Sequence, residues 1–281
     1  MLPKGVTHIK GSKKGPKVGL IACTHGDETI GLHAFRKLKT YLKSHPLIKG
    51  EIFLITNNLK AKESKNRYCD INMNRLPPNA LAQKNPKASE LKRLQKLFPI
   101  MQDLDYVLDL HSTSTMAEPM VIILNQKIPQ IAKTLGIQTI VCNMQKIQKG
   151  RPFISFCGNS KAVRLGIECG IHNSTEAKKV VHTASMNFLE KIGIIQGKKS
   201  SKKWPKSTLY KVSGSIVAPG KEYRLVRNFK PFELLTKGSI ILQKEDGGKV
   251  TIAQDCHAFL PPKSRIIKYP DEELFFTIQK L

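Results

Sequence analysis

Over its first two-thirds the chain alternates short apolar runs with longer segments whose apolar residues recur at helical spacing. Short apolar runs are typical of buried strands, and the longer segments of amphipathic helices. Strands separated by helices pair in parallel and are covered on both faces, so the pattern predicts an α/β fold with a mostly parallel central sheet. The predicted strands are residues 17–21, 51–56, 105–110, 118–125, 138–143 and 162–168, and the predicted helices residues 28–42, 87–98, 127–136 and 174–193.

The composition changes near residue 196. Residues 196–206 are rich in lysine and turn-forming residues, and the runs after them are short, β-like and separated by turns such as "EDGGK". We therefore predict a large domain over residues 1–195, a Lys-rich linker over 196–206 and a smaller C-terminal β domain over 207–281. Residues 57–79 form a long polar stretch without a strand or helix pattern, and long loops of this kind are often functional.

The formal net charge of +26 is large and comes from 47 Lys and Arg against 21 Asp and Glu. Sites for nucleic acids mix arginine and aromatic residues into one patch. Here the basic residues are mostly dispersed lysines and aromatics make up 6% of the chain, so nucleic-acid binding is the least favoured interpretation. A Lys-rich surface is the simplest interpretation, and a field that attracts small anionic substrates is the functional alternative. The sequence leaves homo-oligomer formation open.

No apolar run approaches the roughly 20 residues that span a bilayer. The basic N-terminal segment also lacks the apolar core of a signal peptide. We therefore expect a cytoplasmic protein without a membrane partner. The six cysteines form no CxxC pair, so we expect reduced thiols and no zinc site made of four cysteines.

Three residues are candidate metal ligands. The stretch "ACTHGDETIG" places His25 and Glu28 between a predicted strand and a predicted helix, and His111 directly follows the strand 105–110. The carboxyl ends of parallel strands share one edge of a sheet, where ligands tend to bind. Two imidazoles and one carboxylate suit one Zn²⁺ ion with an open position. Asp109 is a candidate hydrogen-bond acceptor for a ligand imidazole. The alternative is that both histidines only bond to backbone groups.

Metal-assisted hydrolysis also needs a general base, and Glu168 in "GIECG" ends another predicted strand. Arg67, Asn74 and Arg75 lie in the long polar stretch. Arginine binds carboxylates with two parallel hydrogen bonds, and asparagine supplies both a donor and an acceptor. The alternatives are an exposed glutamate and a solvated basic loop.

Four segments, "THGDETIG", "NRYCDINMNR", "LDLHSTS" and "GIECG", together resemble the aspartoacylase / succinylglutamate desuccinylase family of zinc carboxypeptidase-like proteins. The resemblance implies that residues 1–195 are a zinc-hydrolase domain and that His25, Glu28 and His111 hold zinc. It implies that Glu168 is the general base and that Arg67 polarises the scissile carbonyl. The residues that it implies for substrate binding are Asn74 and Arg75, for the α-carboxylate, and Tyr269.

Two positions depart from the family pattern. Gly158 stands where aspartoacylases have an arginine that reads an acidic substrate side chain, and Lys161 and Arg164 are the nearest cations. Asn72 stands where an aspartate is common. The selectivity for N-acetyl-aspartate is therefore open.

The sequence favours a zinc-dependent hydrolase that cleaves the amide bond of a small anionic N-acyl amino acid. The alternatives are N-succinylglutamate desuccinylation, a zinc carboxypeptidase for small peptides and, from a different class, a basic binding protein with an inactive hydrolase fold.

Overall fold

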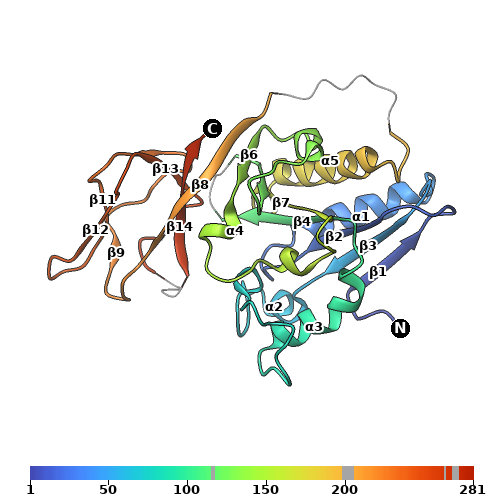
Figure 1. Cartoon of the computed structure of the whole chain (residues 1–281), viewed down its shortest axis with the longest axis horizontal. Helices are drawn as coiled ribbons and strands as arrows, with labels where there is room; N and C mark the ends of the chain where they lie inside the picture. The colour runs from blue at the N-terminus through green and yellow to red at the C-terminus, as the bar shows by residue number, and fades with distance from the viewer. Residues whose placement is uncertain (115–117, 198–205, 263, 268–271) are drawn as a thin grey trace.

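The computed structural model describes residues 1–114, 118–197, 206–262, 264–267 and 272–281. Its main feature is an 11-stranded sheet in the order β1-β3-β2-β4-β7-β5-β6-β8-β14-β13-β10 (Figure 1). The strands of this sheet are β1 (Val6–Lys10), β2 (Lys17–Ala22), β3 (Glu51–Thr56), β4 (Tyr106–Thr113), β5 (Met120–Ile123), β6 (Thr139–Cys142), β7 (Val163–Ile171), β8 (Thr208–Val217), β10 (Leu234–Leu235), β13 (Cys256–Phe259) and β14 (Glu273–Lys280).

The strands that carry the predicted site lie side by side and run parallel. β2 pairs in parallel with both β3 and β4, and β4 pairs in parallel with β7. The predicted α/β fold with a mostly parallel centre is therefore confirmed. Antiparallel pairs flank this group. β1 pairs with β3 on one side, β5 pairs with β7 on the other, and the C-terminal strands pair with one another.

Helices cover the two faces of the sheet. α1 (Ile30–Leu42) and α5 (Thr175–Ile192) share one core with the strands, and α3 (Ser89–Met101) packs on the opposite face (Figure 1). The Ser174 hydroxyl accepts a hydrogen bond from the backbone N–H of Ala177 and so caps α5, and Gly193 ends the helix in the left-handed region. The observed helix therefore begins and ends within one residue of the predicted helix 174–193.

Two local predictions were wrong. The predicted helix 127–136 is only the 3-10 helix Gln130–Thr134, which begins directly after Pro129. The polar stretch 57–79 contains a short helix, α2 (Leu59–Glu63), and the 3-10 helix Met73–Arg75. Asn58 caps α2 by accepting from the N–H of Ala61, which stabilises a helix that is too short and polar to show a periodic pattern.

The C-terminal strands continue the main sheet. β8 pairs in parallel with β6 and antiparallel with β14. The second sheet, in the order β12-β11-β9, consists of β9 (Arg224–Leu225), β11 (Ile240–Gln243) and β12 (Lys249–Thr251). The division into domains at 195 and 207 stays a prediction, and residues 198–205 of the predicted linker lie outside the described residues.

The six cysteines are free thiols, and all but Cys69 are buried. In the described ranges, no helix combines the length and the apolar character that crossing a bilayer requires.

Candidate metal centre and active site

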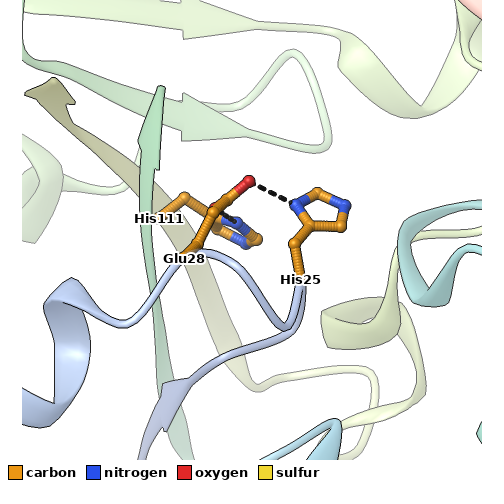
Figure 2. A group of neighbouring side chains, drawn as sticks. All are labelled: His25, Glu28 and His111. Carbon is orange, nitrogen blue, oxygen red and sulfur yellow. Dashed lines mark hydrogen bonds and ion pairs between the residues drawn. The ribbon is translucent and has the colours of Figure 1, made fainter. Parts of the chain in front are cut away.

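The predicted metal ligands and Glu168 meet at the carboxyl ends of neighbouring strands, on the face of the sheet that α3 covers. His25 and Glu28 lie in the turn between β2 and α1, and His111 lies near the end of β4 (Figure 2). β4 is the neighbour of both β2 and β7, and in the β4–β7 ladder His111 is directly opposite Glu168. Residues opposite each other in a ladder point to the same face, so the register places Glu168 on the side of the sheet that carries His111.

The turn after β2 has little freedom. Gly26 donates its backbone N–H to the carbonyl oxygen of Arg67 at 3.0 Å. A Cβ atom at position 26 would lie 2.2 Å from the carbonyl carbon of Ala61, so only glycine fits against α2. This close approach joins the turn that carries His25 and Glu28 to the segment that carries Arg67.

The three candidate ligands converge on one point. The Nδ1 atom of His25 lies 2.6 Å from Oε1 of Glu28, and Nδ1 of His111 lies 2.7 Å from Oε2 of the same carboxylate (Figure 2). One ligand atom from each residue lies within 4.8 Å of the others, and all three side chains are buried. Two imidazole nitrogens and a carboxylate oxygen brought together in this way are a donor set that could hold a zinc ion with its fourth position open.

The outer nitrogen of each imidazole is bound by the protein. Nε2 of His111 lies 2.9 Å from Oδ2 of Asp109, which in turn accepts from the Thr24 hydroxyl. Nε2 of His25 lies 3.1 Å from the side-chain oxygen of Asn72. Acceptors behind a ligand histidine fix its tautomer and leave the other nitrogen for the metal. The donor set and its surroundings therefore fit a resident zinc ion, and Asp109 has the position that the sequence predicts.

Each of the three candidate ligands has a pKa that at least one of the others shifts. Burial by itself would raise the pKa of Glu28, but the two histidines outweigh it through charge and hydrogen bonds and hold the pKa well below its ordinary value. Burial opposes charge on His111 too, yet Asp109 and Glu28 raise its pKa well above the ordinary value. Burial and the neighbouring Arg67 charge lower the pKa of His25. The site thus favours an ionised carboxylate facing His111.

Glu168 has a different environment. Its Oε2 atom is buried and has no hydrogen-bond partner among the described residues. Burial, followed by the negative charge of Glu28, raises the pKa of Glu168 to about 8. A carboxyl group with a pKa near neutrality can both accept and donate a proton, which is the property that a general base needs.

The segment Arg67–Arg75, here called the catalytic loop, brings three further predicted residues to this edge. Arg67 donates from NH1 to Oε1 of Glu28 at 3.3 Å and is 31% exposed. Arg75 donates from Nε to Oε2 of Glu273 at 2.6 Å and from NH1 to the carbonyl oxygen of Asn74. Glu273 belongs to β14, so the C-terminal part of the chain contacts the catalytic loop directly. Tyr269 lies outside the described residues.

Arg164, one of the two cations near position 158, is bound by the protein itself. From β7 its guanidinium donates to carbonyl oxygens of the preceding loop, those of Cys157, Gly158, Asn159 and Ala162. Gly158 has φ +67°, and a Cβ there would lie 2.3 Å from the carbonyl oxygen of Leu104. The local backbone therefore excludes a larger side chain at position 158, and Arg164 stabilises the loop.

Sequence reasoning missed three acidic residues that bind the catalytic loop: Glu272, which accepts from Nδ2 of Asn72, and the two described next, Glu90 and Glu273. Glu90 lies in the first turn of α3, where an acidic residue is ordinary, and Glu273 precedes the apolar run of β14. Neither position has a local signal for a partner in the catalytic loop, because both contacts depend on the tertiary fold.

The comparison with protein families gives a match to the succinylglutamate desuccinylase/aspartoacylase catalytic domain over residues 14–188. The chain belongs to this family. The resemblance seen in the sequence is thereby confirmed, and amide hydrolysis of the desuccinylase/aspartoacylase type is the activity that the family supports. Family membership and the buried His25, Glu28 and His111 group together support a metal-dependent hydrolase.

Solved structures of the family have the same fold. A succinylglutamate desuccinylase/aspartoacylase from Rhodobacter sphaeroides superposes with a TM-score of 0.70 at 17% identity, covering 98% of this chain and 88% of that one. Murine aminoacylase 3 superposes with a TM-score of 0.70 at 17% identity, covering 96% of this chain and 97% of that one. The succinylglutamate desuccinylase from Vibrio cholerae superposes with a TM-score of 0.70 at 16% identity, covering 99% of this chain and 86% of that one. No curated protein sequence matches the chain significantly.

Replacing His111 with alanine should remove zinc binding, because two ligands remain and the Glu28 carboxylate loses one of its imidazole partners. We expect zinc affinity to fall by more than about 100-fold, since even an altered outer contact costs a ligand 10–100-fold. Zinc titration with a competing chelator measures this. The exposed His45 supplies the matched control, His45→Ala, which should bind one zinc per chain. Stoichiometric, tight zinc in His111→Ala would remove this residue from the ligand set.

Proposed function

We propose that the protein is a zinc-dependent hydrolase that cleaves the amide bond of an N-acyl amino acid into a carboxylic acid and a free amino acid. The observation that carries the proposal is the convergence of His25, Glu28 and His111 on one point, with Glu168 opposite His111 on the adjacent strand. Family membership supports the reaction class.

His25 and His111 through Nδ1, and Glu28 through its carboxylate, would hold the metal. When bound, zinc supplies Lewis-acid polarisation of a carbonyl and acidifies water. Glu168 takes the proton of the attacking water, stores it at its unpartnered Oε2 atom and returns it to the leaving amine. The raised pKa of Glu168 favours its holding the proton until the amine leaves.

Arg67 donates to Glu28 through NH1, which is its one hydrogen bond to the ligand group within the described residues. Its guanidinium therefore has further N–H groups for the oxygen of the scissile carbonyl. A fixed positive donor at that oxygen stabilises the negative charge that develops when water adds.

Arg75 and Asn74 are suited to the α-carboxylate of the amino acid. Glu273 binds Nε of Arg75, and within the described part of the chain no contact uses its NH2 group. The NH1/NH2 edge of the guanidinium is thus the edge that can bind a carboxylate with two hydrogen bonds. Asn74 accepts from the N–H of Phe153 through Oδ1, which leaves its Nδ2 group as a donor.

The substrate panel that tests the proposal contains acetyl-aspartate, succinyl-glutamate, acetyl-amino acids with apolar side chains, and dipeptides, each assayed with added zinc. Arg164 donates its N–H groups to carbonyl oxygens of the loop before β7. It therefore does not replace the arginine with which aspartoacylases bind an acidic side chain. We expect hydrolysis of an acetyl-amino acid with a neutral side chain at least about tenfold faster than of acetyl-aspartate, the discrimination of one charged hydrogen bond.

Selective cleavage of succinyl-glutamate would identify a desuccinylase, and selective cleavage of dipeptides a carboxypeptidase. A protein that holds no zinc, cleaves none of these compounds and binds nucleic acid with a steep salt dependence would contradict the proposal.

Replacing Glu168 with glutamine keeps the shape of the side chain and removes its ability to accept a proton. We expect zinc content to stay at one per chain and kcat to fall by about 10²–10⁴-fold, the usual contribution of a general base. The exposed Glu176 provides the control variant Glu176→Gln, which should keep wild-type activity. A kcat within tenfold of wild type in Glu168→Gln would show that another group moves the proton.

Arg75→Lys tests the carboxylate site while it keeps a positive charge beside the buried Glu273. Lysine cannot offer two parallel N–H groups, so KM should rise about tenfold or more with little change in kcat. Steady-state kinetics measures both constants, and Arg151→Lys, at an exposed position, is the control. An unchanged KM would leave the α-carboxylate to other residues.

A further inference from the structure

The catalytic loop is mostly irregular, yet the proposed mechanism needs its side chains in fixed positions. Its regular structure is limited to the 3-10 helix Met73–Arg75. Gly26 holds its beginning through the Arg67 carbonyl, and Glu273 holds its end through Arg75. The middle of the loop, residues 69–71, is held by another group.

That group is the carboxylate of Glu90, which is 0% exposed. Its Oε1 atom accepts from the backbone N–H of Cys69 at 2.8 Å. Its Oε2 atom accepts from the N–H of Asp70 at 3.2 Å and of Ile71 at 3.3 Å. Consecutive N–H groups that point to one side form a concave anion site, and here the chain's own carboxylate occupies it.

Side chains complete the set of donors. Nδ2 of Asn58 donates to Oε1 of Glu90, and the Ser89 hydroxyl, whose shorter contact is to Asp70, lies 3.0 Å from Oε2. The backbone N–H of Asn58 donates to the carbonyl oxygen of Cys23, at the start of the turn that carries His25. Glu90 therefore connects α3, the N-terminal end of α2 and the catalytic loop.

The catalytic loop also binds α3 through Asp70. Its carboxylate accepts from the backbone N–H of Ser89 at 2.8 Å and from the Ser89 hydroxyl at 2.6 Å. Burial would raise the pKa of Glu90, but the N–H of Cys69, the side chain of Asn58 and the other donors outweigh it and lower the pKa. An ionised carboxylate that accepts from three backbone N–H groups and from Nδ2 of Asn58 forms strong, charge-assisted hydrogen bonds.

We infer that Glu90 is a positioning residue for catalysis: its buried carboxylate binds the backbone of residues 69–71 and so fixes Arg67, Asn74 and Arg75 relative to the metal ligands. The role rests on the proposed function, since it acts through the residues that would bind the substrate. Glu90 itself contacts neither the metal ligands nor Glu168.

The test is Glu90→Gln, which replaces one acceptor oxygen by an NH2 group that faces N–H donors. We expect kcat to fall about 100-fold, the effect of an error of about 1 Å in placing catalytic groups. Zinc should stay at one per chain, with its affinity lowered by no more than about 10–100-fold, because the ligands lie on other segments and the loop contributes only the Asn72 contact behind His25. Amide hydrogen exchange should become faster in residues 69–71 and stay unchanged in the sheet. The control is Glu63→Gln, whose side chain is 65% exposed and whose carboxylate pairs with the exposed Lys4.

Wild-type kcat and wild-type exchange in Glu90→Gln would overturn the inference, as would loss of zinc from a folded variant. Exchange in the wild-type protein tests the inference even if no variant folds. The amides of Cys69, Asp70 and Ile71 should exchange at least about 100-fold more slowly than in an open loop, and fast exchange would contradict the role. This readout needs no substrate, so a failed substrate panel and a failed role for Glu90 remain distinguishable.

Discussion

The carboxylate of Glu28 makes the interaction on which the site depends, because each of its oxygens faces a different imidazole. The contact joins the turn after β2 to the end of β4 and aligns the three side chains. The Nδ1 atoms that face Glu28 are also the atoms that would bind zinc. Protons and metal therefore compete for the same nitrogens, and zinc affinity should weaken as the pH falls.

The two halves of the site are supported in different ways. The candidate metal ligands and Glu168 lie on neighbouring strands or in the turn after one, and the register of the sheet places His111 opposite Glu168. The residues proposed to bind substrate lie on a loop, and acidic side chains from distant segments, Glu90 of α3 and Glu273 of β14, hold it in place. Sites built on strands are held more precisely than sites built on loops. The loop is therefore the part of this site that needs support from buried carboxylates.

The sequence predicts well what depends on local pattern. His25 and Glu28 could be found because a strand, a turn and a helix follow one another within a few residues, and His111 because parallel strands share an edge. The partners of the catalytic loop could not be found, since Arg75 and Glu273 are 198 residues apart and no periodic pattern connects them. The direction of Arg164 was equally open, because it depends on the carbonyl groups of one irregular loop. Register likewise appears only in the folded sheet, where His111 lies opposite Glu168.

The most direct test of the account is the coordination of zinc in the wild-type protein, measured by X-ray absorption at the zinc edge or by a crystal structure of the zinc-loaded form. The account predicts one ion with two imidazole nitrogens at about 2.0–2.1 Å and one carboxylate oxygen at about 2.0–2.2 Å. Sulfur in the first shell, or an ion bound away from Glu28, would contradict it.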